Sequence, residues 1–240
     1  MKNILSVVLS KKILFVSIIA FLFVCLFCVG FFCYRTVNVS TPITQYVVVI
    51  DAGHGGIDGG VVGASGETKE SDVNLAYSLC LGAYFEGLNF KVVYTRKDDN
   101  GLYSEFAKNK KTDDMKKREK IINEAKADLV ISVHQNGFTL PDQRGITAFY
   151  KIGSESSKDL ANCIQNRFKQ KIEYARKEAL AGDYFILNCS NTTSVLIECG
   201  FLTNPDEEVL LKDKNYMNKV CHEIFSACVM YFVENRKLEF

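Results

Sequence analysis

The chain of 240 residues has little of several residue types. It contains no tryptophan, three prolines and only three histidines. It also lacks an excess of either charge, because 29 Lys and Arg are matched by 28 Asp and Glu, for a formal net charge of +1. No basic stripe stands out, so the sequence gives no electrostatic argument for nucleic-acid binding. With so few histidines, the position of each one is informative about the chemistry.

A long apolar run near the N-terminus, ILFVSIIAFLFVCLFCVGFFC over residues 13–33, carries the localisation signal. About 20 apolar residues are enough to span a bilayer as a helix. Three lysines precede the run and one arginine follows it directly, which predicts a cytoplasmic N-terminus. We therefore expect a cytoplasmic segment over 1–12, an uncleaved transmembrane signal-anchor over 13–34 and an extracytoplasmic remainder. The alternative is a cleaved signal peptide and a secreted protein. The apolar region of a signal peptide is usually only about 7–15 residues long and is followed by an A-x-A-like cleavage site. The run in this chain is longer, and no such site follows it.

The nine cysteines show no close paired spacing that would indicate a disulfide framework. Three of them belong to the apolar run. For the remaining six, we expect buried thiols that behave as small hydrophobic side chains. These six are Cys80, Cys163, Cys189, Cys199, Cys221 and Cys228.

After a short polar linker over 35–45, residues 46–240 read as one domain of a size that supports a substantial core. Apolar runs bounded by turn residues predict six strands at 46–50, 90–95, 128–133, 145–150, 184–188 and 193–197. Helical spacing predicts helices at 71–86, 114–126, 155–173 and 214–235, with a long polar loop over 97–114. Strands that alternate with helices predict an α/β domain with a twisted, largely parallel (mixed) sheet of about six strands flanked by helices.

Three of the predicted strands end close to a residue suited to metal chemistry: His54, His134 and Glu198. In an open parallel sheet the carboxyl ends of the strands share one edge, which is where ligands bind. A catalytic zinc ion usually takes three protein ligands and leaves one position open for water. The two histidines supply two ligands. For the third we expect a carboxylate before the first helix, namely Glu70, which directly precedes it, with Glu67 as the alternative.

Glu198 then has a separate role as general base and later general acid beside the metal. Such a site hydrolyses amides, because zinc polarises a carbonyl and makes water more acidic. The alternative role of Glu198 is that of a fourth ligand, which would close the site and make it structural. Its position at the end of a separate strand favours the catalytic role.

Four separated motifs, VVVIDAGHGGIDGG, ETKESDVNL, ISVHQNG and VLIECGFLTNPDEE, occur in this order from about residue 46 onward. Together they resemble the zinc-dependent N-acetylmuramoyl-L-alanine amidases of the amidase-3 family. The resemblance implies one Zn²⁺ bound by His54, Glu70 and His134, with Glu198 catalytic. It also implies that Asn136 lies beside the metal and contacts substrate. The expected activity is hydrolysis of the amide bond between N-acetylmuramic acid and L-alanine in peptidoglycan.

An anchor followed by a bare catalytic domain is similar to the germination-specific (CwlD-type) amidases of endospore formers. This likeness implies a role in spore cortex modification, in which muramic-δ-lactam forms, and a location at the bacterial membrane facing the forespore intermembrane space. The chain has no tandem wall-binding repeat, and Gly137 stands where alanine is common in the family. Both features motivate the hypothesis of an accessory exported protein or lipoprotein that recruits the enzyme or improves zinc retention.

Two other functions fit the same residues. One is a zinc peptidase that cuts within the stem peptide, because the metal chemistry is shared. The other is a non-catalytic wall-binding module, which would require the loss of a ligand or of the base. The products released from peptidoglycan distinguish these functions.

Overall fold

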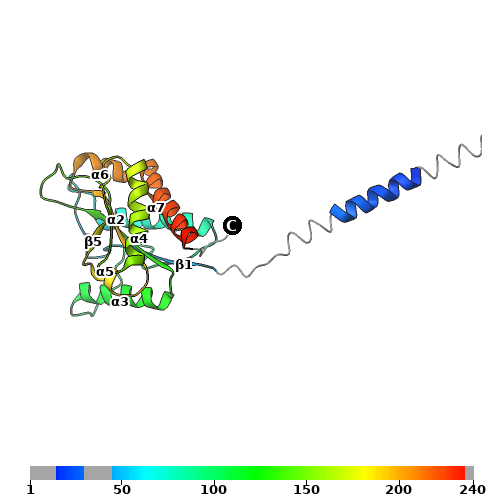
Figure 1. Cartoon of the computed structure of the whole chain (residues 1–240). Coiled ribbons are helices and arrows are strands. Elements are labelled where there is room, and N and C mark those ends of the chain that lie inside the picture. Colours follow the sequence, from blue (N-terminus) through cyan, green and yellow to red (C-terminus); the bar gives the residue numbers. More distant parts are fainter. Residues whose placement is uncertain (1–14, 30–44, 236–240) are drawn as a thin grey trace, which may run out of the picture. The chain divides into compact units, whose positions relative to one another are not determined.

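The computed structural model describes residues 15–29 and 45–235, and the chain divides into two units, 1–44 and 45–240. In the first unit, residues 15–29 form a helix, drawn in blue in Figure 1. No helix among the described residues is both long and apolar enough to cross a membrane. The predicted signal-anchor over 13–34 extends beyond the described residues at both ends. The predicted cytoplasmic segment 1–12 and the linker up to residue 44 lie outside them.

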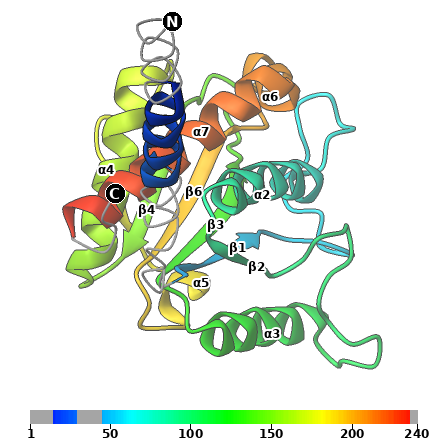
Figure 2. The same ribbon diagram turned by 90° about the vertical axis from the view of Figure 1, so that its right-hand side faces the viewer.

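A six-stranded mixed sheet forms the centre of the second unit (Figure 2), with the strand order β2-β1-β3-β6-β4-β5. Strands β2, β1, β3 and β6 run parallel, whereas β4 pairs with β6 antiparallel and β5 runs parallel to β4. The strands are Val47–Ala52 (β1), Lys91–Tyr94 (β2), Leu129–Asn136 (β3), Thr147–Lys151 (β4), Leu180–Gly182 (β5) and Ser194–Phe201 (β6). The predicted α/β class with a largely parallel, mixed sheet is confirmed.

Apolar residues of the central strands alternate between two core layers, because successive side chains on a strand point to opposite faces. On β1, Val48 and Ile50 pack into one layer and Val49 into the other. Helices α2, α4 and α7 cover the first face, and α3 and α5 cover the second (Figure 2). The helices are Glu70–Gly87 (α2), Lys110–Ala125 (α3), Glu155–Lys171 (α4), Phe185–Asn188 (α5), Pro205–Lys212 (α6) and Lys214–Glu234 (α7).

The prediction of a strand over 184–188 is wrong. Phe185–Asn188 forms the short helix α5, and its Ile186 and Leu187 are buried against the sheet. The sixth strand is instead β5, which directly precedes this helix. A short, mostly apolar run of this length satisfies a strand and a helical turn equally well, so periodicity could not distinguish them.

Two further helical segments differ from the prediction. Helix α6 follows Asn204, whose side chain accepts hydrogen bonds from two backbone N–H groups of the first turn, and it begins at a proline. Helix α3 begins at Lys110, four residues before the predicted start. The polar loop after β2 is therefore shorter than expected, and Lys111 and Asp114 lie on a helix that lines the site.

Candidate metal and catalytic site

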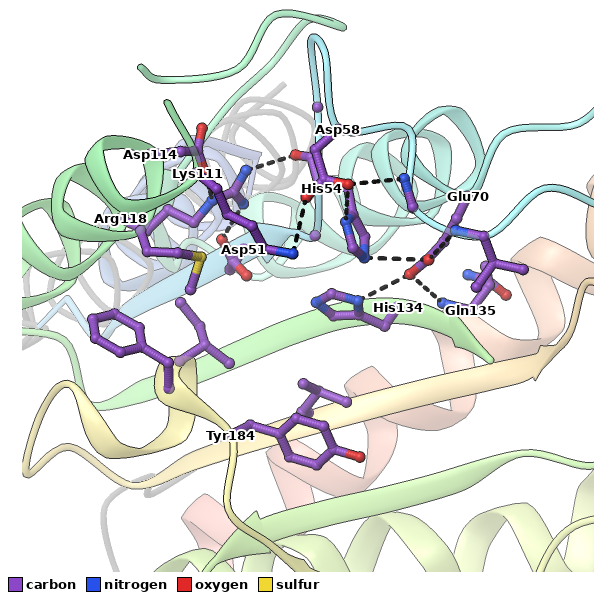
Figure 3. Close-up of a pocket in the computed structure, with 18 of the residues that line it drawn as sticks. Asp51, His54, Asp58, Glu70, Lys111, Asp114, Arg118, His134, Gln135 and Tyr184 are labelled. Carbon is purple, nitrogen blue, oxygen red and sulfur yellow. Dashed lines mark hydrogen bonds and ion pairs between the residues drawn. The ribbon is translucent and has the colours of Figure 1, made fainter. Parts of the chain in front are cut away.

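Three side chains from distant parts of the chain meet at the carboxyl edge of the sheet. His54 follows β1, Glu70 begins α2 and His134 lies on β3, and their potential ligand atoms all lie within 4.8 Å of one another. Glu70 Oε2 is 3.2 Å from His54 Nε2, and Glu70 Oε1 is 2.9 Å from His134 Nδ1. Figure 3 shows both imidazole rings against the same carboxylate. Glu67, the alternative ligand considered from the sequence, is exposed and not part of this group.

The Glu70 carboxylate is buried and held by donors on three sides. The backbone N–H of Val61 donates to Oε2 at 2.9 Å. The backbone N–H of Gln135 and the side-chain amide of Asn74 donate to Oε1 at 3.2 and 3.1 Å. The side-chain amide of Gln135 donates in turn to Asn74 Oδ1 at 3.3 Å. These contacts fix the position of the carboxylate before any ligand binds.

The electrostatics of the group keep Glu70 ionised. Burial raises the pKa of Glu70, but the hydrogen bonds and charges of His134 and His54 lower it by more, so the net pKa lies well below its usual range. For His54, burial lowers the pKa, but Glu70 and then Asp58 raise it by more, so the net pKa is raised. The site therefore combines a permanent negative charge with two imidazoles, a set that suits a divalent cation.

The ring of His54 is oriented by a carboxylate on the opposite side from Glu70. Asp58 Oδ1 lies 3.0 Å from His54 Nδ1, and the backbone N–H of Gly60 donates to the same oxygen at 3.2 Å. Histidine ligands of metals usually donate their second ring nitrogen to such a carboxylate, which fixes the tautomer. Asp58 thus contacts a candidate ligand directly.

Two buried guanidinium groups hold the backbone of the turn that carries His54. Arg96 donates to the carbonyl of Ala52 at 3.0 Å and to that of Gly53 at 2.9 Å. Arg118 donates to the carbonyl of Ala52 at 2.7 Å and to that of His54 at 2.6 Å. The backbone carbonyls of Ala52, Gly53 and His54, which lie in a turn, are thereby hydrogen-bonded to charged donors. His54 itself adopts a left-handed conformation, with φ of 61°, and this network stabilises it.

Two glycines allow the close packing around the site. A β-carbon at Gly53 would overlap the ring of His134. A β-carbon at Gly137 would lie 2.7 Å from the side chain of Val61. Gly137, which stands where alanine is common in the family, therefore has a packing reason in this chain.

Glu198 lies on β6 directly opposite His134 on β3. The carboxylate is buried and its Oε2 has no hydrogen-bond partner among the described residues. Burial, more than any charge around it, raises the pKa of Glu198 to about 7. A carboxyl group with a pKa near neutrality can exchange a proton in either direction, which is the property of a general acid and base. Such an unpartnered group is costly and indicates a functional position.

These groups open into one cavity of about 770 Å³. The three candidate ligands, Glu198 and Asn136 line it, and the side-chain oxygen of Asn136 accepts a hydrogen bond from the N–H of Gly137 at 2.9 Å. An apolar wall from α3 and α5 faces them, and Figure 3 shows Tyr184 on this side of the cavity. This wall consists of Met115, Tyr184, Phe185 and Ile186.

The donor set fits zinc. Two imidazole nitrogens and one carboxylate oxygen match the three-ligand, open arrangement of catalytic zinc sites, whereas calcium and magnesium prefer oxygen ligands alone. Glu198 does not belong to the three-residue group, so its free oxygen is available for proton transfer. His54, Glu70 and His134 would therefore hold the ion.

Several residues lie as the sequence indicated, and others were missed. Cys199, expected to be a buried thiol, packs into the core layer on the opposite face of the sheet. The third histidine, His222 on α7, is not among the residues that line the cavity. The eight cysteines within the described residues are all free. Of the six expected to be buried thiols, Cys199, Cys221 and Cys228 are buried, whereas Cys80, Cys163 and Cys189 are only partly buried, so the expectation is wrong for these three. Sequence reasoning did not identify Asn74 and Gln135. Asn74 lies one helical turn after Glu70, and Gln135 directly follows His134, so their spacing from the candidate ligands was the available signal.

An α/β sheet that gathers this group and a buried carboxylate beside it fits the class of metal-dependent hydrolases. The sequence pattern of the N-acetylmuramoyl-L-alanine amidase family matches residues 48–229, and the chain belongs to this family. It is an N-acetylmuramoyl-L-alanine amidase, an enzyme that acts on peptidoglycan.

Known relatives agree in sequence and in structure. A germination-specific N-acetylmuramoyl-L-alanine amidase of Bacillus subtilis (strain 168) is 33% identical over 200 residues, covering 81% of this chain and 83% of the relative. The CwlD amidase from Clostridioides difficile, solved in complex with the GerS lipoprotein, superposes with a TM-score of 0.76 at 34% identity, over 79% of this chain and 100% of that chain. The catalytic domain of CwlV from Bacillus (Paenibacillus) polymyxa superposes with a TM-score of 0.70 at 29% identity, over 79% of this chain and 99% of that one.

Proposed function

We propose that the amidase reaction depends on Zn²⁺ held by His54, Glu70 and His134, with Glu198 as the catalytic acid and base. The observation that carries this assignment is a buried carboxylate with a free oxygen, placed in register with one of three convergent ligands. When bound, zinc would polarise the scissile carbonyl and make the attacking water more acidic.

The residues of the chain supply the remaining steps. Glu198 removes a proton from the attacking water and delivers it to the departing nitrogen of L-alanine, which balances the hydrolysis. Its pKa near 7 lets it perform both transfers at neutral pH. Asn136, at the cavity wall, contacts the substrate beside the scissile bond. The apolar wall formed by α3 and α5 excludes water from the other side.

Digestion of purified peptidoglycan by the purified chain, with and without added zinc, tests the proposal by mass spectrometry. We expect free stem peptides that begin with L-alanine, released only by the zinc-loaded protein. Glu198→Gln and His134→Ala should both release far less stem peptide than wild type, but only His134→Ala should lose zinc. Fragments cut within the stem peptide would instead indicate a zinc peptidase, and bound zinc without any products would indicate a wall-binding module.

We further propose that the enzyme acts in spore cortex modification, where removal of stem peptides precedes formation of muramic-δ-lactam. The germination-specific relative and the CwlD likeness support this role. Replacement of the chromosomal gene with the Glu198→Gln allele should give spores whose cortex lacks muramic-δ-lactam in muropeptide analysis, while the protein level stays normal. Normal lactam content would contradict the cortex role and leave the amidase activity intact.

The location and partner are proposals of the same kind. The apolar run over 13–33 supports a single-pass anchor with the catalytic domain outside the cytoplasm. The CwlD amidase was solved with a lipoprotein, which supports an accessory lipoprotein for this enzyme. Membrane fractionation with protease protection tests the anchor. Affinity purification of the full chain from sporulating cells tests the partner.

A further inference from the structure

Helices α2 and α7 pack side by side on the face of the sheet opposite to α3 and α5 (Figure 2). Aromatic side chains hold one part of this interface. The ring of Tyr84 on α2 stacks on Phe225 of α7 at 5.7 Å between centroids, and its hydroxyl donates to the carbonyl of Asn218 at 3.5 Å. These contacts set how the two helices lie against each other.

Two cysteines occupy neighbouring positions in the same interface. The thiol of Cys80 on α2 donates to Asn218 Oδ1 of α7 at 3.2 Å. The thiol of Cys221 on α7 contacts the carbonyl oxygen of Tyr77 on α2 at 3.5 Å. Residues three apart lie on one face of a helix. Each thiol therefore touches the residue one turn before the other cysteine, which places the two sulfur atoms beside each other.

We propose that Cys80 and Cys221 are the site of a disulfide cross-link between α2 and α7. Cys80 is partly accessible and Cys221 is buried, so an external oxidant reaches Cys80 first. Cys221 lies beside Cys80, as a resolving cysteine must if it is to attack the oxidised sulfur. No other function derived for the enzyme uses either thiol.

The chemistry is a thiol–disulfide exchange with an external disulfide, such as oxidised glutathione or the disulfide of an oxidoreductase. The Cys80 thiolate attacks one sulfur of that disulfide, forms a mixed disulfide and releases one thiol. The Cys221 thiolate then attacks the Cys80 sulfur and releases the second thiol, so two protein thiols are oxidised and one external disulfide is reduced. A hydrogen bond with Cys221 lowers the pKa of Cys80, which favours the attacking thiolate, whereas burial raises the pKa of Cys221.

The test incubates the full chain in its folded state with oxidised glutathione, blocks remaining thiols with N-ethylmaleimide, and maps peptides after cleavage with trypsin and Glu-C. This digestion releases Cys80 in residues 71–86 and Cys221 in residues 220–223, and it separates Cys221 from Cys228. We expect the cross-linked pair of these two peptides, which disappears on reduction. The melting temperature should rise by about 5–10 °C on oxidation, because a cross-link across a long loop constrains the unfolded chain.

Matched variants make the result decisive. Cys80→Ser and Cys221→Ser should each abolish the cross-link and the rise in melting temperature, whereas Cys189→Ser and Cys228→Ser should preserve both. Complete N-ethylmaleimide labelling of Cys80 at every glutathione ratio would overturn the proposal. A cross-link that forms only after denaturation, or stable glutathionylation of Cys80 without resolution by Cys221, would also overturn it. None of these outcomes depends on amidase activity, so a negative result for the cross-link does not bear on the proposed function, and the reverse also holds.

Discussion

His134 and Glu198 occupy paired positions on the adjacent parallel strands β3 and β6. Both side chains belong to the set that alternates toward α3 and α5, and both line the cavity. A candidate metal ligand and the candidate catalytic base are thus separated by the spacing of two neighbouring strands rather than by a loop. A site on paired strands keeps its geometry when substrate binds, because the ladder of hydrogen bonds fixes both residues.

Glu198→Gln should reduce kcat by about 10²–10⁴, the usual contribution of a general acid–base group, while zinc content and KM change little. The physical reason is that glutamine fills the same volume but cannot carry a proton between water and the leaving nitrogen. Steady-state kinetics on a defined muropeptide and zinc analysis by mass spectrometry measure both quantities. A loss of zinc equal to that of His134→Ala would contradict the catalytic role and assign Glu198 as a fourth ligand.

The site could be anticipated from the sequence where its residues follow buried strands. His54, His134 and Glu198 were expected at one edge because parallel strands end together, and the structure places them around one cavity. Glu70 was preferred to Glu67 because it directly precedes the first predicted helix, and the family resemblance favours the same choice. The structure shows the physical difference, since Glu70 is buried at the first turn of α2 and Glu67 is exposed.

Other features lay beyond sequence reasoning because they depend on tertiary contacts. The side chain of Gln135 on β3 reaches Glu70 through Asn74, and Asn74 and Glu70 both lie on α2. The apolar run 184–188 was short enough to satisfy either period, and only packing against the sheet decides for the helix α5. The parallel core was predictable because its strands are continuous apolar runs, which buried parallel strands require.

Asp58→Ala should weaken zinc binding by roughly 10–100-fold, because the second nitrogen of His54 loses its carboxylate partner. Asp58→Asn keeps a side-chain oxygen at the same position and should weaken binding less. Competition of the metal-free protein with a chelating dye measures both constants. Equal affinities for wild type and Asp58→Ala would show that Asp58 only caps the turn through the N–H of Gly60.

Gly53→Ala should displace the ring of His134, because the new methyl group overlaps it. Overpacking of this kind costs about 1–3 kcal/mol of unfolding free energy, and here it should also reduce zinc content. Gly87→Ala is the matched control, since a methyl group at the end of α2 meets nothing within 4 Å. Urea denaturation and zinc analysis of both variants test the expectation. Full zinc occupancy in Gly53→Ala would show that the ring has room to move.

Asp51→Asn should destabilise the protein at neutral pH, because Asp51 is buried against Arg118 at 2.7 Å and Ser132 donates to it at 2.6 Å. Burial raises the pKa of Asp51, but Arg118 and Ser132 lower it by more, so the net pKa is below its usual value. A depressed carboxyl pKa contributes stability above the unfolded value of about 3.9 and loses it as pH falls through the folded value. The cost of the substitution should be roughly 3–5 kcal/mol at pH 7 and should shrink as the pH falls below about 4.

Urea denaturation of the metal-free proteins across this pH range tests the expectation. Glu124→Gln, which removes an exposed partner of Lys120, is the control and should change stability little at any pH. A cost of Asp51→Asn that stays constant down to the lowest pH would assign the effect to packing rather than to charge.

In the metal-free enzyme, the contribution of Glu198 to the free energy of unfolding should depend on pH in the opposite sense to that of Asp51. Burial raises its pKa to about 7, above the unfolded value of about 4.3, so the folded state binds the extra proton between these values. The contribution of Glu198 to stability is then greatest below about pH 4 and declines as pH rises toward 7, because ionisation of a buried carboxyl with no partner among the described residues is costly. Glu198→Gln removes this cost and should be more stable than wild type by about 1–3 kcal/mol at pH 8, with no difference near pH 4.

Thermal and urea denaturation at both pH values measure the difference in stability between Glu198→Gln and wild type. A gain that is the same at both pH values would trace to packing and not to ionisation, whereas a gain confined to high pH would show that the fold keeps a costly carboxylate at this position for its chemistry.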